Sequence, residues 1–179
     1  MHLKRHGIPY HEDGIAPCNW AAGSIEEYAG LVAKHAGFAP GDDVLDLVSR
    51  YGGRCLYEGV QASAVDDGTI YVHGRCDFDI VLPTYTSPRQ DRYTIAHELA
   101  HYFLHSQQGR IPLVAYRLPH RASTRAEWEA SVFAQALLMP LEEIRLADEQ
   151  GLWLSALAAR FDVPEEAVAL RVRRLHGGG

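Results

Sequence analysis

The sequence has few cysteines, and their spacing excludes two common kinds of site. Its 179 residues include only Cys18, Cys55 and Cys76. Their number is odd and no two lie close together, whereas a disulfide framework or a cysteine zinc site needs paired, closely spaced cysteines. We therefore expect reduced thiols and a cytoplasmic protein.

Long apolar runs and an excess of positive charge are also missing. No stretch of about 18 apolar residues occurs, so we expect no membrane span. Lys4 and Arg5 are not followed by an apolar segment, so no signal peptide is predicted. The formal net charge of −6 gives no general attraction to nucleic acid or to an acidic membrane surface.

The composition is that of a folded chain. The sequence is 47% hydrophobic and 22% charged, and it is long enough for one sizeable core. Residues 1–23 contain glycines and prolines without periodicity, which predicts a flexible arm. Ser24 and Glu27 have capping-box spacing and predict a helix that ends at Gly37, followed by a shorter helix over 44–51.

Three short segments rich in Val, Ile and Tyr predict a small sheet. They are Arg54 to Val60, Thr69 to His73 and Asp79 to Leu82. The last of them lies shortly before the motif with the clearest chemistry.

That motif is HELAH, residues 97–101, which has the pattern HExxH. On a helix, residues four apart share a face, so His97 and His101 can present two imidazoles to one metal ion. Glu98 then lies beside the ion, where a carboxylate can act as general base and acid. The alternative is an amphipathic helix with solvated histidines. An apolar stripe argues instead for a core helix: Ile95, Leu99, Tyr102 and Phe103.

Two histidines leave a catalytic zinc site incomplete, because such sites usually have three protein ligands. On a straight helix His105 lies about 12 Å along the axis from His97, too far for one ion to bridge. We expect His105 to support a ligand, face the substrate or serve the structure. Glu127 and Glu129 begin a second predicted helix after Thr124. Either one can complete the site, or both can serve the cap and the helix dipole.

The segment AHELAHYFLH followed by EWEASVFAQALLMP resembles the ImmA/IrrE family of zinc metallopeptidases. The resemblance spans most of residues 24–175 and implies that Glu127 is the third zinc ligand. Arg92 also matches the family and is expected to anchor its loop to an acidic group. Ala100 replaces the usual glycine. Ser131 replaces an Asn or Asp expected to support a ligand histidine, which predicts weaker zinc binding or activity.

The resemblance implies an α+β, mainly helical, zincin-like fold with a small sheet beside the HExxH helix. We expect the metallopeptidase core in residues 24–150. A helix-turn-helix-like pair, residues 151–176, is expected to pack on it. Edge strands bind substrate in such peptidases, so Ile80 to Leu82 either has this role or completes the sheet. Tyr116 and His120 are candidates for stabilising an oxyanion.

We therefore expect a regulatory, gluzincin-like zinc metallo-endopeptidase. Zn2+ is held by His97, His101 and Glu127, and zinc-bound water attacks the peptide bond with Glu98 as general base. The resemblance implies a protein substrate, a helix-turn-helix repressor or an antitoxin. Two alternatives remain open: a non-catalytic metal-containing module that regulates a transcription factor, and a DNA-binding regulator. The second is disfavoured by Glu165 and Glu166, which begin the helix that would face the phosphates.

Overall fold

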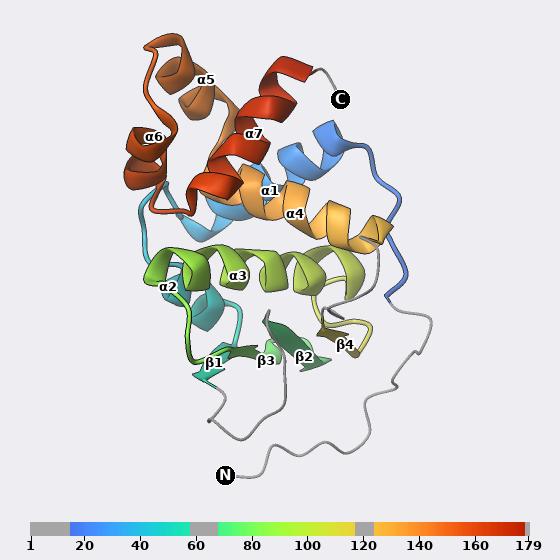
Figure 1. Ribbon diagram of the computed structural model, residues 1–179. Coiled ribbons are helices and arrows are strands. Elements are labelled where there is room, and N and C mark those ends of the chain that lie inside the picture. Colours follow the sequence, from blue (N-terminus) through green and yellow to red (C-terminus); the bar gives the residue numbers. More distant parts are fainter. Residues whose placement is uncertain (1–14, 58–67, 117–123, 178–179) are drawn as a thin grey trace.

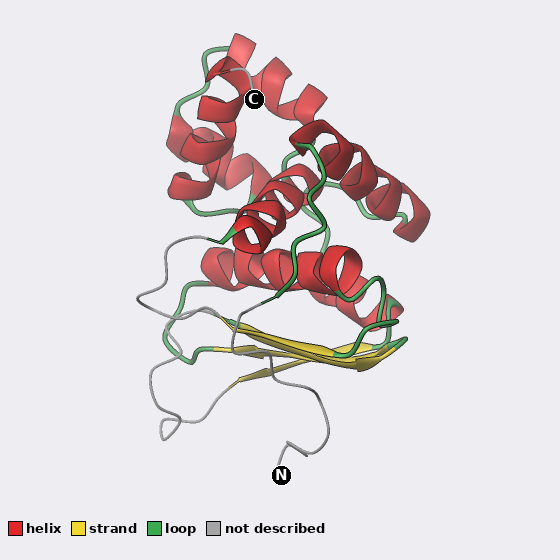
Figure 2. Cartoon of the chain, turned by 90° about the vertical axis from the view of Figure 1, so that its right-hand side faces the viewer, coloured by secondary structure: helices red, strands yellow, loops and turns green. Residues whose placement is uncertain are grey.

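The computed structural model describes residues 15–57, 68–116 and 124–177. Its helices lie on one side of a single sheet, as Figure 1 and Figure 2 show. The helices are α1 (Ala22–Ala36), α2 (Val44–Arg50), α3 (Pro88–Ala100), the π-helix η1 (His101–His105), α4 (Arg125–Leu138), α5 (Leu141–Glu149), α6 (Leu154–Phe161) and α7 (Glu165–Gly177). The strands are β1 (Gly53–Tyr57), β2 (Thr69–Gly74), β3 (Asp77–Leu82) and β4 (Leu113–Tyr116). This confirms the predicted α+β class.

The sheet has the strand order β1-β3-β2-β4, with β1 parallel to β3 and the other pairs antiparallel. β3 is therefore central: Ile80 lies opposite Cys55 on one side and Ile70 on the other. Both of its backbone edges are used within the sheet. The prediction that Ile80 to Leu82 binds substrate by strand addition is wrong, and this segment completes the sheet.

The three predicted strands are present with shifted bounds: β1 begins one residue earlier, β2 ends one residue later and β3 begins two residues earlier than predicted. The described part of the first strand ends at Tyr57, and the predicted residues 58–60 lie outside the described ranges. The strand β4 was not predicted from the sequence. It has four residues and pairs with β2, so it depends on a partner distant in sequence, which local patterning does not reveal.

The helix α3 lies between the sheet and α4 (Figure 1). The predicted apolar stripe is confirmed: Ile95, Leu99, Tyr102 and Phe103 are all buried. Tyr102 stacks on Phe78 of β3 with ring centroids 4.3 Å apart, and Phe103 stacks on Phe133 of α4 at 5.6 Å. The HExxH helix is therefore fixed from two sides by aromatic packing.

The two N-terminal helices pack on different elements. α1 packs on α4, whereas α2 packs on β1 and α3. α1 also begins at Ala22, with Ala21 as its N-cap, so the predicted capping box at Ser24 is wrong. The segment before α1 contacts α4, because the backbone N–H groups of Cys18 and Asn19 donate to Glu129.

The C-terminal helices pack on the rest of the chain. Arg171 of α7 is only 2% exposed, and it pairs with Glu26 of α1 and donates to the backbone oxygen of Met139. Of the three arginines of α7, only Arg173 is exposed. This arrangement favours packing over DNA contact as the role of the helical pair. None of the described helices is both long and apolar enough to cross a membrane.

Candidate metal centre

The helix α3 begins at Pro88, nine residues before His97. Ser87 is its N-cap and accepts a hydrogen bond from the backbone N–H of Gln90 at 3.2 Å, and proline is well suited to the first helical position. Arg92, one turn later, is buried and donates to the backbone oxygen of Asp42. The hydrogen-bond partner of Arg92 is thus a carbonyl and not the acidic group that was predicted.

The three predicted ligand side chains meet between α3, η1 and α4. Nε2 of His97 lies 3.1 Å from Oε2 of Glu127, and Nε2 of His101 lies 3.5 Å from Oε1 of the same carboxylate. The candidate ligand atoms of all three residues lie within 4.8 Å of one another. Two imidazole nitrogens and one carboxylate therefore converge on a single point.

The start of α4 sets the direction of Glu127. Thr124 caps the helix, and its Oγ1 accepts a hydrogen bond from the backbone N–H of Glu127 at 3.2 Å. This is one half of the predicted capping box. The backbone N–H of Glu127 thus takes part in the helix cap, while its carboxylate contacts His97 and His101.

The HExxH helix continues into a π-helical turn. The backbone N–H of Ser106 donates to the oxygen of His101 at 2.9 Å, five residues back. Turns of this kind are uncommon and often mark functional sites. Here the turn carries His105 to a position where its Nδ1 lies 2.9 Å from Nδ1 of His101. His105 thus contacts a candidate ligand and is not grouped with the three ligand atoms.

Glu129 lies on the far side of His105. Its Oε2 is 3.1 Å from Nε2 of His105, and both side chains are fully buried. The carboxylate also accepts hydrogen bonds from the backbone N–H groups of Cys18 and Asn19 and from Nε of Arg125. Glu127 and Glu129, which the sequence left as alternatives, therefore have different partners.

The ionisation of this pair follows from its surroundings. Burial opposes the charge on Glu129, but the hydrogen bonds from His105, Cys18 and Arg125 outweigh burial and hold the pKa of that carboxyl below its ordinary value. Burial lowers the pKa of His105, against the opposite effect of Glu129. A charged carboxylate thus faces a neutral imidazole.

A second group of possible metal ligands comprises Cys18, His105 and Glu129, whose donor atoms also lie within 4.8 Å of one another. A metal site needs a thiolate, yet burial raises the pKa of the Cys18 thiol and Glu129 raises it further. Glu129 already accepts hydrogen bonds from four donors. We therefore assign this group as a hydrogen-bonded cluster that supports the first one.

Ser131 has a different contact from the one predicted. Its hydroxyl donates to the backbone oxygen of Glu127 at 2.9 Å, one helical turn back. Its one proton is therefore used within α4. The group that we find on Nδ1 of His101 is His105. Sequence spacing could not identify this contact, because it depends on the π-helical turn.

Glu98 is 4% exposed and lies where β2 begins. A Cβ atom placed on Gly68 would lie 2.4 Å from Cγ2 of Thr94 and 3.5 Å from Oε1 of Glu98. Only glycine allows the sheet to approach the helix this closely. Of the two candidates for stabilising an oxyanion, Tyr116 lies opposite Thr69, the first residue of β2. His120 lies outside the described residues. This role of Gly68 was not predicted from the sequence.

A family model matches this chain, and a solved structure is similar to it in fold. A family model described as Peptidase_M78, IrrE N-terminal-like domain, matches residues 55–173. No significant match is found among curated proteins. A solved structure described as a Mycobacterium tuberculosis transcriptional regulator is similar with a TM-score of 0.59 and 19% sequence identity, over 87% of this chain and 48% of that one. This likeness shows the fold alone, and the chain spans about half the length of that protein.

Proposed function

The chain belongs to the family of IrrE N-terminal-like peptidase domains, and on this premise we propose that it is a zinc-dependent metallo-endopeptidase. The observation that carries the proposal is the convergence of His97, His101 and Glu127 on one point, with Glu98 next to His97 in the same helix. A structural zinc site has no use for Glu98 and usually has four protein ligands.

The donor set fits zinc. Two imidazole nitrogens and one carboxylate oxygen are ligands that zinc takes in catalytic sites, where a fourth position stays open. The two histidine side chains are at most 6% exposed, whereas Glu127 is 18% exposed. The carboxylate thus lies on the more accessible side of the cluster, where water and substrate can approach.

Bound zinc would supply Lewis acidity and lower the pKa of a coordinated water. The protein's own contribution is Glu98, which takes a proton from the attacking water and returns it to the leaving amine. Glu98 is buried on α3 beside the start of β2, and this burial limits competing water around its carboxylate. Hydrolysis then proceeds without an acyl-enzyme.

We also propose a regulatory role in the cytoplasm. The family supports a protein substrate, and a helix-turn-helix repressor or an antitoxin is the substrate class we favour. The similar solved structure is itself described as a transcriptional regulator. The three cysteines of the chain are unpaired, which supports a reducing compartment.

The test is cleavage of a proteome-derived peptide library, read by mass spectrometry, with wild-type protein beside Glu98→Gln. We expect zinc-loaded wild type to cut and the variant to lose about 10²-fold to 10⁴-fold in rate while it keeps its zinc. Glu142→Gln, an exposed change on α5, is the control and should cut normally. Equal cleavage by wild type and Glu98→Gln would contradict the proposal. Full-length partners after long incubation with zinc-loaded protein would favour a binding module.

A further inference from the structure

A continuous chain of hydrogen bonds runs from a candidate metal ligand into the protein interior. Nδ1 of His101 lies 2.9 Å from Nδ1 of His105, and Nε2 of His105 lies 3.1 Å from Oε2 of Glu129. All three residues are at most 7% exposed. These contacts join η1 to α4 behind the metal centre.

One set of tautomers satisfies every contact in this chain. Nε2 of His101 faces Glu127, so Nδ1 carries the proton when Nε2 binds a metal. That proton is donated to Nδ1 of His105, which then carries its own proton on Nε2. His105 donates in turn to the Glu129 carboxylate, which can only accept. Each ring thus has a single protonation site and a fixed orientation.

Glu129 is itself held by the segment that precedes α1. The backbone N–H groups of Cys18 and Asn19 donate to its two oxygens at 2.9 and 2.7 Å. Arg125 donates to Glu129 through Nε at 3.1 Å and to the backbone oxygen of Trp20 through Nη2 at 2.5 Å. A segment about 110 residues away in sequence therefore fixes the carboxylate.

We propose that His105 and Glu129 are positioning residues for His101, and that the segment Cys18–Trp20 completes this support. The proposal rests on the metal centre of the proposed function. The two ligand histidines differ, because Nδ1 of His97 has no hydrogen-bond partner among the described residues. Support of His101 therefore decides how well the histidine pair is preorganised for an ion.

The first test is zinc affinity, measured by competition with a chromophoric chelator. His105→Leu should bind zinc about 10-fold to 100-fold more weakly than wild type. His105→Gln should recover part of this loss, because an amide can accept from one neighbour and donate to the other. His73→Leu is the matched control, because it removes the 3.0 Å contact between His73 and Asp79, which lies away from the metal centre. The zinc affinity of this variant should equal that of wild type.

A second variant tests the N-terminal support at the surface, where folding is less at risk. Arg125→Met should weaken zinc binding about twofold to fivefold, whereas Arg145→Met on α5 should not. The visible spectrum of the cobalt-substituted protein adds a geometric readout. His105→Leu should shift its bands and His73→Leu should leave them in place.

The failures can be told apart. If Glu127→Ala loses zinc but His105→Leu binds zinc within about twofold of wild type, the positioning role alone is overturned. An absence of zinc binding by wild type overturns both this inference and the proposed function. Thermal melts of the metal-free proteins establish that each variant is folded before its affinity is compared.

Discussion

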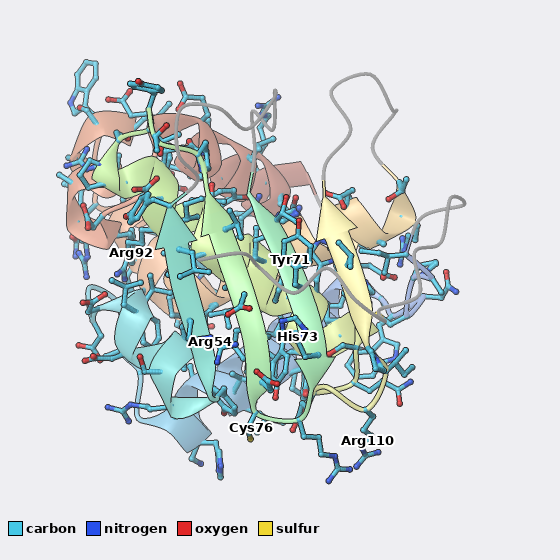
Figure 3. All side chains as sticks on the ribbon, turned by 90° about the horizontal axis from the view of Figure 1, so that it is seen from below. Arg54, Tyr71, His73, Cys76, Arg92 and Arg110 are labelled. Atoms are coloured by element: carbon cyan, nitrogen blue, oxygen red, sulfur yellow. The ribbon has the colours of Figure 1, made fainter. Side chains whose placement is uncertain are left out.

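Two histidine–carboxylate pairs of nearly equal length lie on opposite sides of the sheet. His105 and Glu129 are 3.1 Å apart among the helices, and His73 and Asp79 are 3.0 Å apart on the face opposite them, where Figure 3 shows His73 and Arg54. The first pair is fully buried and touches a candidate metal ligand. The second is partly exposed and its carboxylate pairs with Arg54 at 2.6 Å. The two pairs have the same chemical groups but different surroundings. The inner pair contacts a candidate metal ligand, whereas the outer pair contacts an arginine at the surface.

Burial and the number of hydrogen-bond donors determine how much each pair contributes to the free energy of unfolding. Glu129 accepts hydrogen bonds from four donors: the backbone N–H groups of Cys18 and Asn19, and the side chains of Arg125 and His105. Asp79 is held by two side chains, and one of them, Arg54, is mostly exposed. Loss of the inner carboxylate therefore leaves more buried polar groups without a partner.

Removal of each carboxylate should show the largest difference between the two pairs. We expect Glu129→Leu to lower the free energy of unfolding of the metal-free protein by about 3 kcal/mol, because it strands several buried donors. Asp79→Leu should cost about 1 kcal/mol. Urea denaturation of the two variants beside wild type measures both values. Equal losses would contradict the distinction between the two pairs.

The outer pair should also show a pH dependence of its own. Burial opposes the ionisation of Asp79, but Arg54 and His73 outweigh burial and lower the pKa of that carboxyl. A lowered folded-state pKa gives stability that is present above the unfolded value of about 3.9 and is lost as pH falls through the folded value. The difference in unfolding free energy between wild type and Asp79→Asn should therefore be larger at about pH 6 than at about pH 3. A difference that grows on acidification would rule this explanation out. Asp77, also paired with Arg54, stays intact in both proteins.

The sequence predicted the parts of the centre that depend on local spacing. The helical period across α3 and η1 identified the buried apolar stripe and the pair His97 and His101, and Thr124 was recognised as the cap of α4. Glu127 came from the resemblance to a family, because spacing alone did not separate it from Glu129.

The parts that were missed depend on contacts between distant segments. The π-helical turn has no sequence signature, and it brings His105 to His101. The attachment of Cys18 and Asn19 to Glu129 joins residues about 110 positions apart. The central place of β3 likewise follows from pairing with strands on both sides, which the alternation of one strand cannot reveal.

The most direct test of the metal centre is zinc content by mass spectrometry after zinc loading and removal of free metal. We predict about one zinc per chain in wild type and a large loss in Glu127→Ala. Asp79→Asn changes a carboxylate of the outer pair and should retain the wild-type content. Wild type without zinc, or Glu127→Ala with its full complement, would contradict the assignment of His97, His101 and Glu127 as the ligands.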